Sequence, residues 1–142
     1  MITIFSWNRN KVLMKLVLIF LLVIGFISLP KIIIYFLNNG NPYDKAVVTK
    51  HVPTYLEKQG YTDSDISEQR YLEPKHTINR KVLHGHYAVI FNDEPGLEYY
   101  YGVTKFRKKV VQFCGKEDQF GELITKETKH SEKDCLDQFS NK

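Results

Sequence analysis

The chain lacks the short motifs that mark the common enzyme classes. None of the patterns G-x-S-x-G, H-E-x-x-H, the phosphate-binding P-loop or a zinc-finger spacing occurs in its 142 residues. Only two cysteines are present, Cys114 and Cys135, and they do not form a C-x-x-C motif, which argues against a thiol-redox enzyme. We therefore predict that the protein is not an enzyme and that it needs neither a cofactor nor a metal.

Acidic residues are absent from residues 1–40, which carry four basic ones: Arg9, Lys11, Lys15 and Lys31. Residues 41–142 carry 16 basic and 16 acidic residues, so the whole formal charge of +4 lies on the first segment. A basic protein raises the question of nucleic acid, but here the excess charge flanks an apolar run. The charge pattern therefore predicts a membrane segment and no nucleic-acid partner.

Residues 16–37 form the apolar run, in which 17 of 22 residues are Leu, Ile, Val or Phe. As a helix this run would be about 33 Å long, and the hydrocarbon core of a bilayer is about 30 Å thick. Lys31 lies near one end, where its amine can reach the membrane surface, and membrane helices tolerate a proline such as Pro30. The run predicts an uncleaved transmembrane helix surrounded by lipid.

Two other interpretations of this run stay open. A basic segment before an apolar run is also typical of a signal peptide, which would give a secreted protein. However, no small-x-small cleavage site follows the run, and apolar residues resume after Lys31. In a variant of the anchor, the helix bends and residues 32–37 lie in the membrane interface.

The orientation follows from the basic residues near the ends of the run. Arg9, Lys11 and Lys15 precede it, and the first basic residue after it is Lys45. The positive-inside rule therefore places residues 1–15 in the cytoplasm as a short tail. We predict a single-pass protein of the cell membrane, with everything after about Asn38 on the extracytoplasmic side.

The segment after the run begins with the features of a helix start. Asn41 can cap, Pro42 suits the first helical position, and Asp44 favours the positive end of the helix dipole. Gly60 would end this helix, and Pro53 predicts a kink or break near residues 50–52. The expected apolar face consists of Tyr43, Ala46, Val47, Tyr55 and Leu56.

The pattern then changes to strands, which we expect at residues 66–73, 82–91, 97–104 and 109–114. Pro95-Gly96 suits the centre of a type II turn. The predicted fold class is α+β, with a helix packed on a three- or four-stranded antiparallel meander sheet in a domain spanning residues 41–114. The composition of the charged tail, residues 115–142, predicts either a short amphipathic helix or a largely disordered segment.

The stretch from Tyr55 to Gln112 resembles an uncharacterised family of small membrane-anchored proteins of Gram-positive bacteria (Firmicutes). The resemblance implies one N-terminal membrane segment and a short extracytoplasmic domain of unknown function, and it implies no catalytic residue. The residues that carry it are Tyr55-Leu56, Gly60-Tyr61, Asp65-Ile66, the turn Phe91-Asn92-Asp93-Glu94-Pro95, Tyr99-Tyr100-Tyr101 and Val110-Val111-Gln112.

The two cysteines lie on the predicted extracytoplasmic side, where disulfides persist. A bridge between Cys114 and Cys135 would close a loop of about 22 residues and stabilise the fold by roughly 3 kcal/mol. The alternative is a pair of unpaired thiols.

Two groups of residues are candidates for binding. Tyrosines can present flat area and a hydrogen-bonding tip to a sugar or peptide, although the same pattern is typical of a core face and of cross-strand pairing. A basic turn outside the cell can meet anionic wall polymers or lipid head groups, although most charged turns are only solvated. The candidates are Tyr87, Tyr99, Tyr100 and Tyr101, and in the turn Lys105, Arg107, Lys108 and Lys109.

Two weaker candidates are polar clusters. His84 and His86 would share one strand face, but a metal site needs further ligands, and His51, His76 and His130 show no paired spacing. The carboxylates of Asp93, Glu94 and Glu98 lie near a mobile, wet turn, where strong pKa tuning is not expected.

The sequence as a whole favours a binding or interaction module in the cell envelope. The expected partner is another membrane or envelope protein, or an anionic wall polymer. The alternatives are an envelope enzyme, either a hydrolase or a thiol-active one, and the secreted protein described above.

Overall fold

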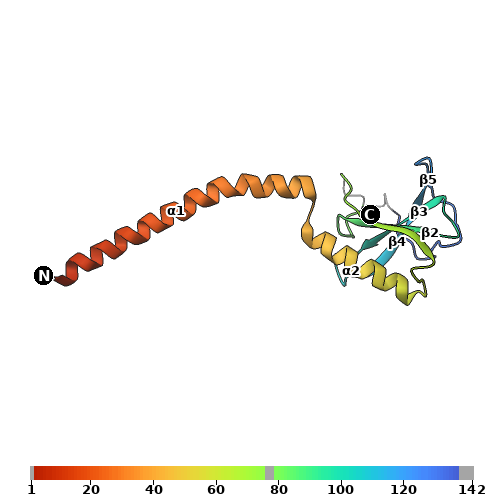
Figure 1. The fold of residues 1–142 in the computed structure, drawn as a ribbon, viewed down its shortest axis with the longest axis horizontal. Helices are drawn as coiled ribbons and strands as arrows, with labels where there is room; N and C mark the ends of the chain where they lie inside the picture. The colour runs from red at the N-terminus through yellow and green to blue at the C-terminus, as the bar shows by residue number, and fades with distance from the viewer. Residues whose placement is uncertain (1, 76–78, 138–142) are drawn as a thin grey trace. The chain divides into compact units, whose positions relative to one another are not determined.

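The first compact unit of the protein is one long helix. The computed structural model describes residues 2–75 and 79–137, and it divides the chain at residues 39 and 40. Helix α1 (Ile2–Asn39) runs unbroken through Pro30 and extends beyond the predicted residues 16–37 at both ends (Figure 1). Its apolar side chains from Val12 to Leu37 are exposed. Among the described residues, α1 holds the apolar stretch that is long enough to cross a membrane.

The second unit, residues 40–142, begins with helix α2 (Pro42–Lys58). The side chain of Asn41 accepts a hydrogen bond from the backbone N–H of Tyr43 at 3.0 Å, so the predicted cap is present. Gly60 ends the helix with a φ of 95°, a left-handed conformation that glycine adopts without steric cost.

Helix α2 differs from the prediction in its middle and in its apolar face. The predicted break near residues 50–52 is absent. Pro53 removes only one backbone donor, and the helix continues because Val52 and Leu56 on either side of it are buried in the core. The buried stripe is Val48, Val52 and Leu56, spaced four residues apart, and Tyr43 is exposed.

A five-stranded sheet follows, in which each strand is antiparallel to the next in chain order. The predicted α+β fold and the meander topology are confirmed, with five strands in place of three or four (Figure 1). The strands are β1 (Ile66–Leu72), β2 (His86–Phe91), β3 (Leu97–Val103), β4 (Val110–Asp118) and β5 (Leu123–Ile124).

The turn between β2 and β3 is not the type II turn that Pro95-Gly96 suggests. The backbone N–H of Leu97 donates to the carbonyl of Glu94 at 3.1 Å, which closes a four-residue turn. Gly96 does not have the positive φ that a type II turn requires at its third position. Most residues can adopt a type I geometry, so the sequence pair alone does not decide between the two turn types.

The core lies on both faces of the sheet. On the α2 side, the stripe of α2 packs against alternate residues of the central strands, including Val89, Phe91 and Val103. On the opposite side, Ala88, Tyr100 and Phe113 form a second cluster with Val82 and Leu136. Residues far apart in the chain therefore cover both faces of the sheet.

The segment after Cys114 is part of the domain. Strand β4 continues to Asp118, past the predicted end at residue 114, and β5 pairs with it. The backbone N–H of Leu136 donates to the carbonyl of Gln112 at 2.8 Å, and the two cysteines are joined by a disulfide. The prediction of a helical or disordered tail is therefore wrong for residues 115–137, and residues 138–142 lie outside the described part.

Candidate functional site

The four candidate tyrosines belong to the core. Tyr99 and Tyr101 are 0% and 1% exposed and pack on the α2 side with Tyr87, whereas Tyr100 is buried on the opposite side. Burial raises the pKa of each hydroxyl above its ordinary value. These side chains therefore offer no surface to a sugar or peptide. They have the structural role that the sequence analysis gave as the alternative, that of core residues of the sheet.

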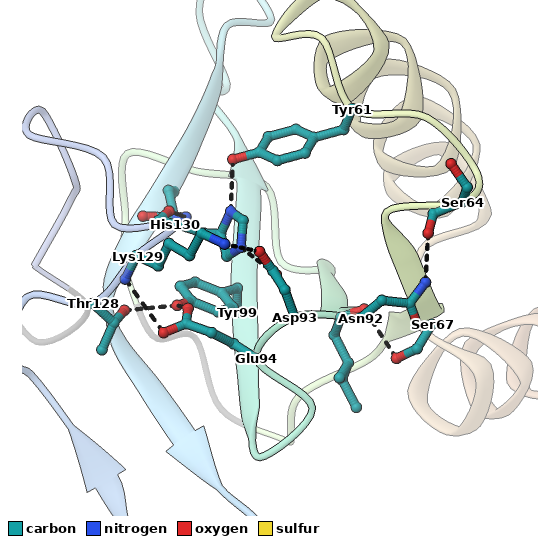
Figure 2. A network of polar contacts seen from close by, with 12 residues as sticks. Tyr61, Ser64, Ser67, Asn92, Asp93, Glu94, Tyr99, Thr128, Lys129 and His130 are labelled. Atoms are coloured by element: carbon teal, nitrogen blue, oxygen red, sulfur yellow. Dashed lines mark hydrogen bonds and ion pairs between the residues drawn. The ribbon is translucent and has the colours of Figure 1, made fainter.

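A polar network fastens the segment after β5 to the β2–β3 turn (Figure 2). The ring of His130 stacks on Phe91, with ring centroids 3.9 Å apart, and its Nε2 lies 2.7 Å from the carboxylate of Asp93. Its Nδ1 lies 3.0 Å from the hydroxyl of Tyr61. Both ring nitrogens therefore have protein partners, which leaves neither free to move a proton for a substrate.

The carboxylates of this turn are paired in the same way. Lys129 and His130 hydrogen-bond Asp93 and hold its pKa down at about 2. Glu94 accepts a hydrogen bond from Tyr99, whose hydroxyl also lies 2.7 Å from that of Thr128. A third carboxylate, that of Glu98, is ion-paired with an arginine of β1. Each of the three weighed carboxylates therefore has a protein partner of its own.

A hollow of about 380 Å³ lies beside the disulfide and holds a lysine next to a serine. Lys116 is 2% exposed, and its Nζ lies 2.7 Å from the Oγ of Ser131 and 3.4 Å from the carbonyl of Cys114. Burial lowers the pKa of Lys116. The backbone N–H of Thr128 also donates to the Oγ of Ser131 at 2.9 Å. A hydroxyl that accepts from two nitrogen donors is typical of a structural contact.

His86 begins β2, and His84 lies two residues before it; the two histidines have separate partners. His84 contacts Glu73 through its Nδ1 at 2.7 Å. His86 is 4% exposed and packs edge-on against the ring of Phe113. No group of three or more metal-ligating side chains gathers within residues 2–75 and 79–137. His76 lies outside the described residues.

The basic turn faces a set of residues on α2. Lys108 and Lys109 line a hollow of about 420 Å³ together with Lys50 and Lys58. Two further members of the predicted cluster, Lys105 and Arg107, are exposed and are not among the lining residues. The structure thus brings half of the predicted basic cluster together with α2 lysines that the sequence analysis did not single out.

The DUF3139 family, which is described as a protein of unknown function, matches residues 7–101 of the chain. The chain belongs to the DUF3139 family. No curated protein and no solved structure matches it. The match to a family of unknown function agrees with the expected uncharacterised family, and it assigns no activity to the chain.

The DUF3139 match divides the candidate sites. It covers most of α1, all of α2, β1 and β2, and most of β3, and so includes Lys50 and Lys58. It ends before the basic turn, the disulfide, and the Lys116–Ser131 contact. The α2 lysines were open to discovery from spacing, because Lys50, Thr54 and Lys58 recur every four residues on one helix face.

Proposed function

We propose that this DUF3139 protein is a single-pass membrane protein whose outer domain, residues 40–142, is a binding module in the cell envelope and not an enzyme. The observation that carries the membrane-spanning part of the proposal is α1, because its apolar side chains are exposed over a length that matches a bilayer. A soluble protein would leave this surface in water at a large cost. The neutral second unit has its own core and needs no lipid.

The disulfide supports the proposed orientation. Cys114 and Cys135 are joined, with Cα atoms 5.0 Å apart. Disulfides persist mainly in oxidising compartments outside the cytosol. The basic residues before the apolar stretch favour a cytoplasmic N-terminus, and both arguments therefore support the proposal that residues 40–142 are extracytoplasmic.

Cysteine labelling in intact cells tests this topology. After treatment with a membrane-impermeant reductant, Cys114 and Cys135 are expected to react with a membrane-impermeant maleimide in intact, wall-stripped cells. A cysteine placed on the other side by Asn8→Cys, in a Cys114→Ser/Cys135→Ser background, is expected to react only after lysis. The intact mass of the purified chain is expected to include residues 1–39.

Two results would contradict the topology. Labelling of Asn8→Cys in intact cells, with protection of Cys114 and Cys135 until lysis, would reverse the orientation. A mature mass that lacks the first segment would support the secreted alternative, in which no anchor remains.

A second candidate function is a serine hydrolase that uses a lysine as its base. It is favoured by the 2.7 Å contact between Lys116 and Ser131, because burial lowers the pKa of the lysine and a neutral amine can accept the proton of a serine. The contact also lies at a hollow that is open to a ligand. The two hydrogen bonds that the Oγ of Ser131 accepts argue for the binding module instead.

A fluorophosphonate probe separates these two functions. If the domain is a binding module, the full-length protein in detergent takes up no more probe than its Ser131→Ala variant, as measured by intact mass. Labelling of the wild type that Ser131→Ala and Lys116→Met both abolish would favour the hydrolase. Ser67→Ala, at an exposed serine of β1, is the matched control.

A further inference from the structure

The hollow between α2 and the β3–β4 turn gathers positive charge in a domain that is neutral as a whole. Four lysines line it, Lys50 and Lys58 from α2 and Lys108 and Lys109 from the turn. Among the residues that the structure describes, no acidic one lines it. Within the described residues, none of these four amines forms an ion pair with a carboxylate. The amines therefore repel one another in the absence of a counter-charge.

One carboxylate lies near the hollow and has other contacts. Glu132 accepts a hydrogen bond from the hydroxyl of Tyr55 at 2.9 Å and from no lysine of the hollow. Burial raises its pKa, although the charge of Lys109 acts in the opposite direction. A single half-buried carboxylate beneath one wall does not balance four amines.

The turn that carries Lys108, one of the lining lysines, has an unusual backbone conformation. Arg107 and Lys108 have φ values of 63° and 50°, a left-handed conformation that residues with a Cβ adopt only at an energetic cost. The turn is closed by Thr104, whose backbone N–H donates to the carbonyl of Lys109 at 2.8 Å. The ammonium of Lys108 lies 5.1 Å from the ring centroid of Tyr43. Because turns of this kind favour asparagine or glycine, the two basic side chains are the unusual feature.

The polar groups of α2 at the hollow have a defined state. The Nδ1 of His51 lies 2.8 Å from the carbonyl of Val47, so this nitrogen carries the ring proton and donates it. The hydroxyl of Thr54 donates to the carbonyl of Lys50 at 3.0 Å. The donors that remain for a ligand are therefore the lysine amines.

We propose that this hollow binds a ligand through a phosphate group esterified to a small alcohol or sugar. Lysine amines bind phosphate as point charges, and a dianion offsets the repulsion among several amines better than a single carboxylate does. The volume of about 420 Å³ exceeds that of one phosphate ion and lies in the range of small-ligand pockets. The proposal deepens the proposed function, because it gives the binding module a ligand class.

Binding is measured on the full-length protein in non-ionic detergent, by calorimetry with glycerol 3-phosphate and with inorganic phosphate. The Lys58→Gln/Lys108→Gln variant removes one amine from each wall of the hollow and is expected to weaken binding at least tenfold. The matched control, Lys105→Gln/Lys126→Gln, removes the same charge from two exposed lysines outside the hollow. It is expected to change the affinity less than twofold.

A second measurement does not depend on any variant. In ¹⁵N–¹H spectra of the wild type, glycerol 3-phosphate is expected to shift the backbone amide signals of residues 50–52, 54–58 and 108–109 and to leave those of β5 unchanged. Equal weakening in both variants, shifts spread over all lysines, or no binding at 10 mM probe would overturn the proposal.

The source of the phosphate is decided by a bilayer arm. Nanodiscs that contain phosphatidic acid are compared with nanodiscs of phosphatidylcholine, with and without the hollow substitutions. If phosphatidic acid raises the thermal stability of the wild type and the hollow substitutions remove this effect, the ligand is a lipid head group. If phosphatidic acid has no such effect and glycerol 3-phosphate still binds in detergent, the ligand is a phosphate ester that is not part of a lipid. The detergent assay does not depend on the orientation of the protein in the membrane. A reversed orientation would therefore contradict the proposed function without contradicting the proposed phosphate site.

Discussion

Substitution of Gln112 by leucine is expected to lower the free energy of unfolding by about 4 kcal/mol and the midpoint of thermal unfolding by about 20 °C. Gln112 is 1% exposed and makes three hydrogen bonds. Its Nε2 donates to the hydroxyl of Tyr101 at 2.9 Å and to the carbonyl of His130 at 2.8 Å. Its Oε1 accepts from the backbone N–H of Glu132 at 2.7 Å.

The effect is large because the leucine satisfies none of these partners. Each buried polar group left without a partner costs about 1–3 kcal/mol, and Tyr101 is too deeply buried to turn to water. The carbonyl of His130 and the N–H of Glu132 can recover hydration only if the segment that carries them leaves the sheet. We expect the segment around residues 130–132 to detach from the sheet, while the disulfide at Cys135 keeps the chain beyond it attached to β4.

Near-ultraviolet circular dichroism of the full-length protein in detergent measures the transition. The signal of the buried tyrosines reports on the domain, because the single tryptophan, Trp7, lies outside residues 40–142. The matched control is Gln69→Leu, at an exposed glutamine of β1 whose side chain accepts one long hydrogen bond, 3.4 Å from the hydroxyl of Tyr87. We expect a change within about 0.5 kcal/mol for this control. Similar losses in both variants would show that Gln112 has no special role.

Local signals in the sequence predict much of this fold. Asn41, Pro42 and Gly60 set the ends of α2 because capping acts within one helical turn. The alternation of Tyr99, Tyr100 and Tyr101 places the middle ring on the opposite face of β3, as the period of two requires. These features depend only on neighbours in the chain.

The features that the sequence does not predict depend on partners far away in the chain. The segment after Cys114 has few apolar residues, and its order comes from contacts such as that between Gln112 and His130, which are 18 residues apart. Strand β5 exists because β4 offers it an edge. No local pattern announces these pairings, and a polar composition by itself suggests disorder.

The candidate sites show the same division. Lysines of the basic turn were predicted from their spacing, whereas the opposite wall of the hollow comes from α2, about 50 residues earlier in the chain. The tyrosines pointed to binding because the residue types that form interfaces also form cores. Only their burial distinguishes the two roles.

The domain is expected to lose about 3 kcal/mol of stability as the pH falls from 6.5 to 4, because of His86. Burial beside Phe113 and the neighbouring His84 lower the pKa of His86 to about 4, against a weaker opposite effect of Glu73. In the unfolded chain the ring takes up a proton near its ordinary value of about 6.5. The contribution is therefore fully present above pH 6.5, declines as the pH falls to about 4, and is lost below that.

Comparison of unfolding midpoints for the wild type and His86→Leu between pH 4 and pH 7 isolates this group. The variant is expected to be flatter across the interval, since leucine has no proton to take up. Other groups cancel in the difference between the two curves: Glu132, whose raised pKa acts in the opposite sense, and Asp93, whose pKa of about 2 confines its effect to the acid side of the interval. Equal slopes for wild type and His86→Leu would mean that the buried ring accepts a proton in the folded state as readily as in the unfolded chain.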